Sequence, residues 1–320
     1  MVYRSIEDVK KARRKGISFE RMVDEVLKSP GLLNQYEGHL FEILNTAGMQ
    51  LNPKESIWID MTSESWRKLP LEKQQSYTSD YQSWYAQQMG FSEPKQIKSL
   101  LTSDLEMRLI PPALYLQGSP EDEKGRDENE QQRRVLISRP FWCGTYAVTG
   151  AQWNAVMQYD PSYFPGIEQR PVEKVHWLDT QLFCNRSGFR LLTEGEWEYT
   201  CRSGTTTAYS FGNELSELPD YAWFSKNANN QTHLVGQKKA NAFGLYDMHG
   251  NVWEWCSDCY QEFYEAEETD PQGPKSGAGR VIRGGSWSNP AGRCRSAYRF
   301  WSEPNRRTSY VGFRVACAID

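Results

Sequence analysis

Residues 280–299 read RVIRGGSWSNPAGRCRSAYR, and the chain closes on a second apolar run, VGFRVACA, at residues 311–318. The first stretch opens with four residues of strand character, breaks at a Gly-Gly pair and continues without a helical or strand period. The same alternation of short strands and irregular aromatic stretches begins at VLI, residues 135–137. Helical spacing occurs at residues 149–157 and 194–201. The pattern predicts an α+β domain with much irregular structure.

Length and composition narrow the possible functions. The chain has 320 residues, enough for two ordinary domains. Its 12 Trp and 17 Tyr exceed the usual content of globular proteins, and such side chains fill a core or line a binding surface. The formal net charge of −4 argues against a nucleic-acid partner, because phosphate binding depends on clustered Lys and Arg.

Two further features bear on location. No apolar stretch approaches the roughly 20 residues that span a bilayer, and SIEDVKKARRKG at residues 5–16 is charged rather than the apolar run of a signal peptide. The seven cysteines are few for the length and odd in number, which is typical of reduced thiols. We therefore predict a cytoplasmic protein without a membrane span.

The first hundred residues contain start and stop signals of helices. Capping residues and Gly or Pro breaks predict four helices, at residues 5–16, 18–29, 32–44 and 70–89. We expect a helical domain over residues 1–100, available to a partner protein, and a second domain over residues 101–320.

Two charged segments have their own interpretations. The run KKARRK, Lys10 to Lys15, is interpreted as a solvated helix face, and contact with nucleic acid or an acidic partner is the alternative. Residues 119–134, SPEDEKGRDENEQQRR, nearly lack apolar side chains and are predicted to form a loosely held surface loop.

The second half resembles the formylglycine-generating-enzyme family, whose domain is also called the sulfatase-modifying-factor domain. Six markers occur in the family's order: MRLIPPALYLQGSPEDE from Met107, FWCGTYAVTGAQWNAVM from Phe141, PVEKVHWLDTQLFCN from Pro171, RLLTEGEWEYTCRSG from Arg190, NAFGLYDMHGNVWEWCSD from Asn241, and the stretch from Arg280 with its closing VGFRVA. The resemblance covers about two thirds of the chain and implies a C-type-lectin-like fold. The segment between Cys184 and Phe189 is shorter than in many members.

The resemblance also implies an activity that one residue contradicts. The family's enzyme oxidises a peptide cysteine to formylglycine with oxygen, using copper(I) held by two thiolates, which are the soft ligands that this ion prefers. The matching positions here are Asn289 and Cys294. An asparagine amide is a hard donor, so we expect no copper site and no oxidase activity. The alternative is an oxidase that acts through Cys294 alone or with a cysteine close only in space; otherwise Cys294 is a small buried residue.

A calcium site is a second implication of the resemblance. Family members similar to DMHGNVWE, residues 247–254, bind calcium through the positions matching Asp247, Gly250, Val252 and Glu254. Calcium prefers such a mixture of carboxylate and carbonyl oxygens, and its role would be structural. The alternative is that Glu254 pairs with a core arginine such as Arg283 or Arg314.

The C-terminal segment resembles a binding surface. Family members without the catalytic cysteines include the variable proteins of diversity-generating retroelements, in which this segment is hypermutated. Between its fixed points lies a mixture of aromatic, Arg and small polar residues of the kind found in paratopes. The predicted ligand-binding residues are Ser288, Asn289, Arg293, Phe300, Trp301, Thr308, Ser309 and Tyr310.

Phe300 and Trp301 are the expected surface anchor of this segment. The arginines of the fixed frame are interpreted as scaffold, because their five donors suit irregular backbone; they are Arg283, Arg295, Arg299, Arg307 and Arg314. We predict a non-catalytic, calcium-stabilised protein that presents this face to a protein or another macromolecular ligand.

Overall fold

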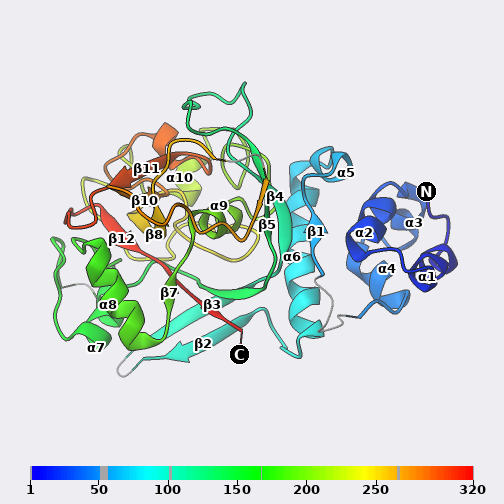
Figure 1. Cartoon of the computed structure of the whole chain (residues 1–320), viewed down its shortest axis with the longest axis horizontal. Coiled ribbons are helices and arrows are strands. Elements are labelled where there is room, and N and C mark those ends of the chain that lie inside the picture. Colours follow the sequence, from blue (N-terminus) through cyan, green and yellow to red (C-terminus); the bar gives the residue numbers. More distant parts are fainter. Residues whose placement is uncertain (1, 51–56, 101–102, 167, 265–266, 320) are drawn as a thin grey trace.

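A computed structural model describes residues 2–50, 57–100, 103–166, 168–264 and 267–319. Figure 1 shows a small helical module at the N-terminal end, a long helix beside it and a larger body of sheets and loops. Within the described residues, no helix is both long and apolar enough to cross a bilayer.

The N-terminal module consists of short helices. Within residues 2–50 these are α1 (Ile6–Arg14), α2 (Phe19–Leu27), α3 (Pro30–Gln35) and α4 (Leu40–Thr46). The start of α1 is the expected one, with Ser5 and Asp8 forming a capping box. The single helix expected over residues 32–44 is two helices instead, because Glu37 and Gly38 have φ values of 52° and 82°. This left-handed conformation ends a helix.

The long helix α6 (Leu71–Gln88) joins the module to the body. Two aromatic side chains of α6 stack on phenylalanines of the module. The ring centroids of Trp84 and Phe19 are 5.2 Å apart, and those of Tyr81 and Phe41 are 5.4 Å apart. In Figure 1, α6 stands between helices α1 to α4 and the sheets. One hydrophobic core runs through both parts of the chain.

Residues 57–100 pack with the body and not with the helical module alone. Two strands from this segment enter its sheets: β1 (Ile59–Asp60) pairs in parallel with β4 (Ala113–Gln117), and β2 (Lys95–Ser99) pairs antiparallel with β3 (Asp104–Ile110). In α5 (Glu64–Arg67), Trp66 Nε1 donates to Gly204 O at 2.9 Å. Residues 57–100 thus contact both the helical module and the body, and the boundary expected at residue 100 stays a prediction.

Three sheets form the body within the described residues. The first has the order β1-β4-β5-β9, with β5 (Arg133–Ile137) and β9 (Glu267–Thr269). The second has the order β11-β10-β8-β12, with β8 (Trp253–Cys259), β10 (Arg280–Arg283), β11 (Arg299–Ser302) and β12 (Val311–Phe313). The third has the order β2-β3-β6-β13-β7, with β6 (Phe141–Gly144), β7 (Arg190–Leu191) and β13 (Val315–Ala318). The stretch at residues 280–299 thus connects two neighbouring strands of the second sheet.

Two helices of the body were predicted from the sequence. Both predicted helices are present, as α7 (Gly150–Met157) and α9 (Glu194–Arg202), and each starts with a Thr capping box. The helix α8 (Trp177–Ser187) was not predicted. It leaves Leu178 and Leu182 exposed, so its apolar residues do not gather on one face. The remaining helical turns are α10 (Leu218–Tyr221) and the 3-10 turn η1 (Ala291–Cys294).

Buried ion pairs hold the irregular loops of the body. Four of the five expected scaffold arginines are buried: Arg283, Arg295, Arg299 and Arg314. Arg299 Nε, for example, lies 2.7 Å from Glu194 Oε1. The fifth, Arg307, is exposed and pairs with Asp179. Together, these pairs fix irregular segments of the mixed α+β body between its strands and helices.

Candidate functional site

The turn after β10 contains the position where the enzymes have their first cysteine. Gly284 and Gly285 have φ values of 97° and 72°, a conformation that glycine adopts without strain. Asn289 is 8% exposed, and its Oδ1 accepts a hydrogen bond from Ser286 Oγ at 2.6 Å. Its backbone oxygen accepts from Ser225 N at 3.0 Å. Asn289 therefore fixes the turn, and its side chain is not part of an exposed ligand surface.

Cys294 lies beneath this turn and is 0% exposed. A Cβ atom at Gly285 would lie 2.8 Å from its Sγ, so the thiol is packed directly against that glycine. Its neighbours in a small apolar cluster include Tyr209 and Phe211. Burial raises the pKa of Cys294 to about 12, which leaves the thiol protonated at neutral pH.

Cys201 is a second buried thiol of the same region. Burial also raises the pKa of Cys201 to about 12, and its Sγ lies 3.8 Å from His249 Nδ1. The histidine ring connects the two cysteines, because Nδ1 is 2.9 Å from Cys294 O. Ser210 N donates to Nε2 at 3.1 Å, so the proton of the neutral ring lies on Nδ1. Burial lowers the pKa of His249 to about 4, so its ring is neutral. Arg283 and Arg202 act to lower the pKa of Cys201, but burial outweighs them.

The loop of the expected calcium site has one unsatisfied carboxylate. Asp247 is 4% exposed, and its Oδ2 accepts from Gly236 N at 2.9 Å. Its Oδ1 is buried and has no hydrogen-bond partner among the described residues. Burial raises the pKa of Asp247 to about 6. A cation at Oδ1 would satisfy this oxygen and favour the charged form.

The second carboxylate of that loop is already paired. Arg314 Nη2 donates to Glu254 Oε1 at 2.9 Å, and Trp197 Nε1 donates to Oε2 at 2.8 Å. The core arginine that we gave as the alternative partner is therefore Arg314. Gly250 and Val252 are both buried in the same loop. Asp247 fits a calcium ligand, whereas Glu254 in this arrangement does not, because a guanidinium occupies both of its oxygens.

The two expected aromatic anchors lie on the edge strand β11. Phe300 is 45% exposed and Trp301 is 41% exposed. Adjacent residues of a strand point to opposite faces of the sheet, and the ring contacts agree: Phe300 packs near Trp253, with 6.2 Å between centroids, and Trp301 near Tyr260, at 6.3 Å. The two rings therefore flank the edge of the sheet and do not form one contiguous patch.

The remaining predicted ligand-binding residues occupy two segments. Ser288 and Arg293 are exposed on either side of the turn that holds Asn289. The segment Thr308, Ser309 and Tyr310 is half-buried, and its carbonyls hold neighbouring side chains and backbone. Trp287 Nε1, for example, donates to Ser309 O at 3.0 Å.

A cleft of about 700 Å³ beside Arg293 was not anticipated from the sequence. Its lining combines the loop at residues 120–125 with residues 206–209 and the turn η1; the polar members include Asp122, Glu123, Lys124, Thr206, Thr207, Asn213 and Arg295. Tyr209 and Leu215 add apolar surface. The sequence carries no signal for this cleft, since its walls are far apart along the chain.

Arg295 fixes one wall of this cleft. Its Nη2 lies 2.6 Å from Glu130 Oε1, and its Nη1 lies 2.5 Å from Glu123 Oε1. Glu130 is 1% exposed. The segment at residues 119–134 lies largely at the surface, as predicted, but it is not loosely held, because the buried Arg295 pairs with Glu123 and Glu130 within it.

Three comparisons relate the chain to known proteins. The Sulfatase-modifying factor enzyme 1-like domain matches residues 91–319. Formylglycine-generating enzyme from Streptomyces coelicolor is 36% identical over 200 residues, which is 57% of this chain and 62% of that protein. The chain spans about half to two thirds of the length of the formylglycine-generating enzymes it matches.

Two solved structures share the fold of the body. Treponema denticola variable protein 1 has a TM-score of 0.66 and 30% identity, with 70% of this chain and 99% of that chain covered. PvdO from Pseudomonas aeruginosa has a TM-score of 0.65 and 27% identity, with 71% and 99% covered. Because the domain matches well over half of the chain, this protein belongs to the sulfatase-modifying factor enzyme 1-like family.

Proposed function

We propose that this protein is a non-catalytic member of its family that binds a protein or another macromolecular ligand at its C-terminal face. The observation that supports the proposal most strongly is that one of the two expected thiols is missing and the other is buried. Asn289 replaces one copper ligand and is used by the turn, while Cys294 is inaccessible, with a pKa of about 12. The copper(I) site that the resemblance implies would need two thiolates, the soft ligands that this ion prefers.

The oxidase alternative rests on Cys201 as a substitute ligand. Cys201 is the thiol near Cys294, but it is also buried and protonated at neutral pH. The similarity to formylglycine-generating enzymes keeps this alternative worth testing. We expect no peptide oxidation.

The binding face is proposed to consist of exposed side chains around the cleft and the edge strand. Arg293 follows Gly292, which lines the cleft, while Phe300 and Trp301 add apolar area on the two sides of the edge strand β11. Exposed aromatic and Arg side chains are the residue types that dominate binding energy in protein interfaces. The similarity to Treponema denticola variable protein 1 supports a ligand-binding role and a segment diversified by a retroelement.

A structural calcium ion is proposed at Asp247. The unpartnered Oδ1 supports it, together with oxygens of the surrounding loop. Glu254 is proposed to stay with Arg314. Removal of calcium would then lower the stability of the loop without changing the ion pair.

Two further proposals concern the setting of the protein. All seven cysteines are free in the structure, which supports a reducing, cytoplasmic location. We propose a partner protein for the helical module. We propose no nucleic-acid partner, because the formal net charge is −4 and the half-buried Lys10 of the run KKARRK already pairs with Glu7 at 3.1 Å.

The binding face can be tested by quantitative affinity enrichment from a lysate of the source organism. Wild-type protein is compared with a Phe300→Ser/Trp301→Ser/Arg293→Ser variant. A Leu178→Ser/Leu182→Ser variant, which removes exposed apolar residues of α8, is the control. A partner lost only from the face variant supports the proposal. A partner retained by the face variant contradicts it.

A further inference from the structure

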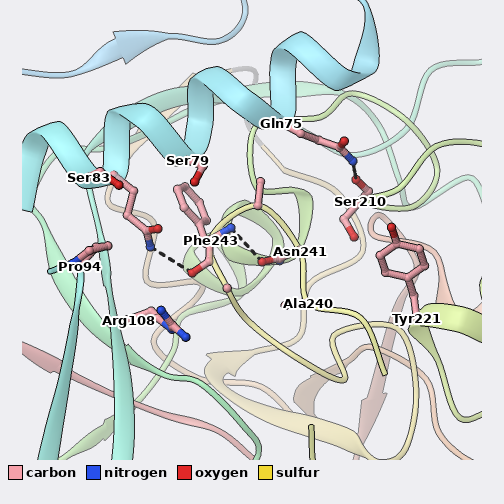
Figure 2. A pocket seen from close by; sticks show the side chains of 13 residues that line it. Gln75, Ser79, Ser83, Pro94, Arg108, Ser210, Tyr221, Ala240, Asn241 and Phe243 are labelled. Carbon is pink, nitrogen blue, oxygen red and sulfur yellow. Dashed lines mark hydrogen bonds between the residues drawn. The ribbon is translucent and has the colours of Figure 1, made fainter. Parts of the chain in front are cut away.

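A polar cavity of about 420 Å³ lies between α6 and the loop at residues 240–244. Figure 2 shows Gln75, Ser79 and Ser83 along one side of α6, with Arg108 and Tyr221 on other walls. The cavity is therefore built from two parts of the chain. It does not share lining residues with the cleft beside Arg293.

The walls of the cavity are fixed by side-chain hydrogen bonds. Gln82 Nε2 donates to Phe243 O at 3.1 Å and to Leu109 O at 2.7 Å. At the other end, Gln75 Nε2 donates to Ser210 O at 2.9 Å. The dashed lines in Figure 2 follow such contacts. Because α6 is held at two points along the cavity, the cavity is preformed, as small-molecule sites usually are.

Arg108 supplies the only charge of the described lining. Its Nη2 lies 3.2 Å from Glu106 Oε1, but Lys95 also pairs with Glu106, at 2.8 Å. Two cations thus share one carboxylate, which leaves a local excess of positive charge. Arg108 Nε is buried and has no hydrogen-bond partner among the described residues.

Gly244 positions the guanidinium of Arg108. A Cβ atom there would lie 3.0 Å from Arg108 Nε and 3.1 Å from Cζ, so the planar group rests on the glycine backbone. The φ of Gly244 is +74°, which also favours glycine. The side chain of Arg108 is 22% exposed and held in one place.

The hydroxyls opposite Arg108 are available to a ligand. Ser79 and Ser83 are one helical turn apart on α6, so they face the same side. Within the described residues neither hydroxyl has a hydrogen-bond partner. The hydroxyl of Tyr221 has none among these residues either. The lining therefore offers one guanidinium, several hydroxyls and no carboxylate.

We propose that this cavity binds a small anionic ligand rich in hydroxyls, a sugar phosphate or a sugar acid. Its anionic group pairs with Arg108, because a guanidinium is the side chain best suited to phosphate and carboxylate. Its hydroxyls contact Ser79, Ser83 and Tyr221. The ligand bridges α6 and the body, so binding also stabilises their contact. The proposal is independent of the C-terminal face.

Calorimetric titration of the full chain tests the proposal, with ribose 5-phosphate, gluconate and neutral ribose as probes. We expect saturable binding of at least one anion and weaker or no binding of ribose. Arg108→Gln should weaken anion binding by about tenfold or more, since a charge-assisted pair is lost. Ser79→Phe, at an exposed helix position, should block the cavity by volume alone. Arg134→Gln, an exposed arginine of β5, is the matched control and should bind as wild type.

The phosphate and carboxylate probes distinguish the two sources of the anion. An affinity that falls in Arg108→Gln and Ser79→Phe but not in Arg134→Gln supports the site. No binding of either anion at millimolar concentration overturns it, as does binding that neither cavity variant weakens. If Arg108→Gln does not fold, the Ser79→Phe result decides.

Discussion

Replacing Asp247 by asparagine should make the stability of the protein less dependent on pH. Burial raises the pKa of Asp247 to about 6 from the ordinary 3.8. Between these values the native state binds more protons than the unfolded state, so the free energy of unfolding falls as pH rises through this range. The difference of roughly two pKa units corresponds to about 3 kcal/mol when the carboxyl is fully ionised.

Asparagine is a close structural match for this position. It tolerates the φ of 59° at Asp247, and its side-chain oxygen can still accept from Gly236 N. The amide nitrogen takes the place of the unpartnered Oδ1 and leaves its two buried donors unpaired, which costs roughly 1–3 kcal/mol or more at every pH. That constant cost cancels when the variant is compared with wild type at two pH values.

The assay is urea unfolding followed by tryptophan fluorescence in the presence of a calcium chelator. The stability of Asp247→Asn relative to wild type should rise by roughly 2 kcal/mol between pH 4.5 and pH 8, because part of the cost is already present at pH 4.5. A relative stability that does not change with pH would refute the reasoning. Added calcium at pH 8 should stabilise wild type but not the variant; equal effects would refute the calcium proposal.

Three further predictions follow from burial and ion pairing. Arg295→Met should destabilise the protein by about 3–5 kcal/mol, since two buried carboxylates lose their partner; a change below about 1 kcal/mol in urea unfolding would contradict this. A thiol reagent added to the native protein should leave Cys294 unmodified by mass spectrometry, whereas it should react after denaturation; rapid native labelling would contradict its burial. Phe300→Ser and Trp301→Ser should each cost at most about 2 kcal/mol of stability while reducing ligand binding; unchanged binding would exclude these rings as contacts.

Local signals in the sequence predicted local structure well. The helices α7 and α9 were predicted from helical spacing, and in the structure Thr149 and Thr193 each begin a capping box that fixes the start of the helix. The family markers predicted the fold of the body, and the domain match at residues 91–319 confirms them. In contrast, α8 has no apolar stripe because Leu178 and Leu182 are exposed.

Contacts between distant segments could not be predicted in the same way. The parallel pairing of β1 with β4 has no local signature, and it ties a segment expected to belong to the helical domain to a sheet of the body. The partner of Glu254 had two alternatives in the sequence, and only the packing of Arg314 selected one. Phe300 and Trp301 are adjacent in the sequence and were therefore expected to form one surface patch. Because both lie in strand β11, their side chains point to opposite faces of the sheet.

The proposal that the protein is non-catalytic is tested most directly by anaerobic titration of the metal-stripped protein with copper(I), followed by oxygen uptake with a cysteine-containing sulfatase-type peptide. Formylglycine-generating enzyme from Streptomyces coelicolor serves as the positive control. We predict no tight one-to-one copper binding and no oxygen uptake above the peptide blank, because Asn289 and the buried Cys294 do not form a thiolate pair. Tight one-to-one binding with conversion of the peptide cysteine to formylglycine would contradict the proposed function and identify the protein as an enzyme.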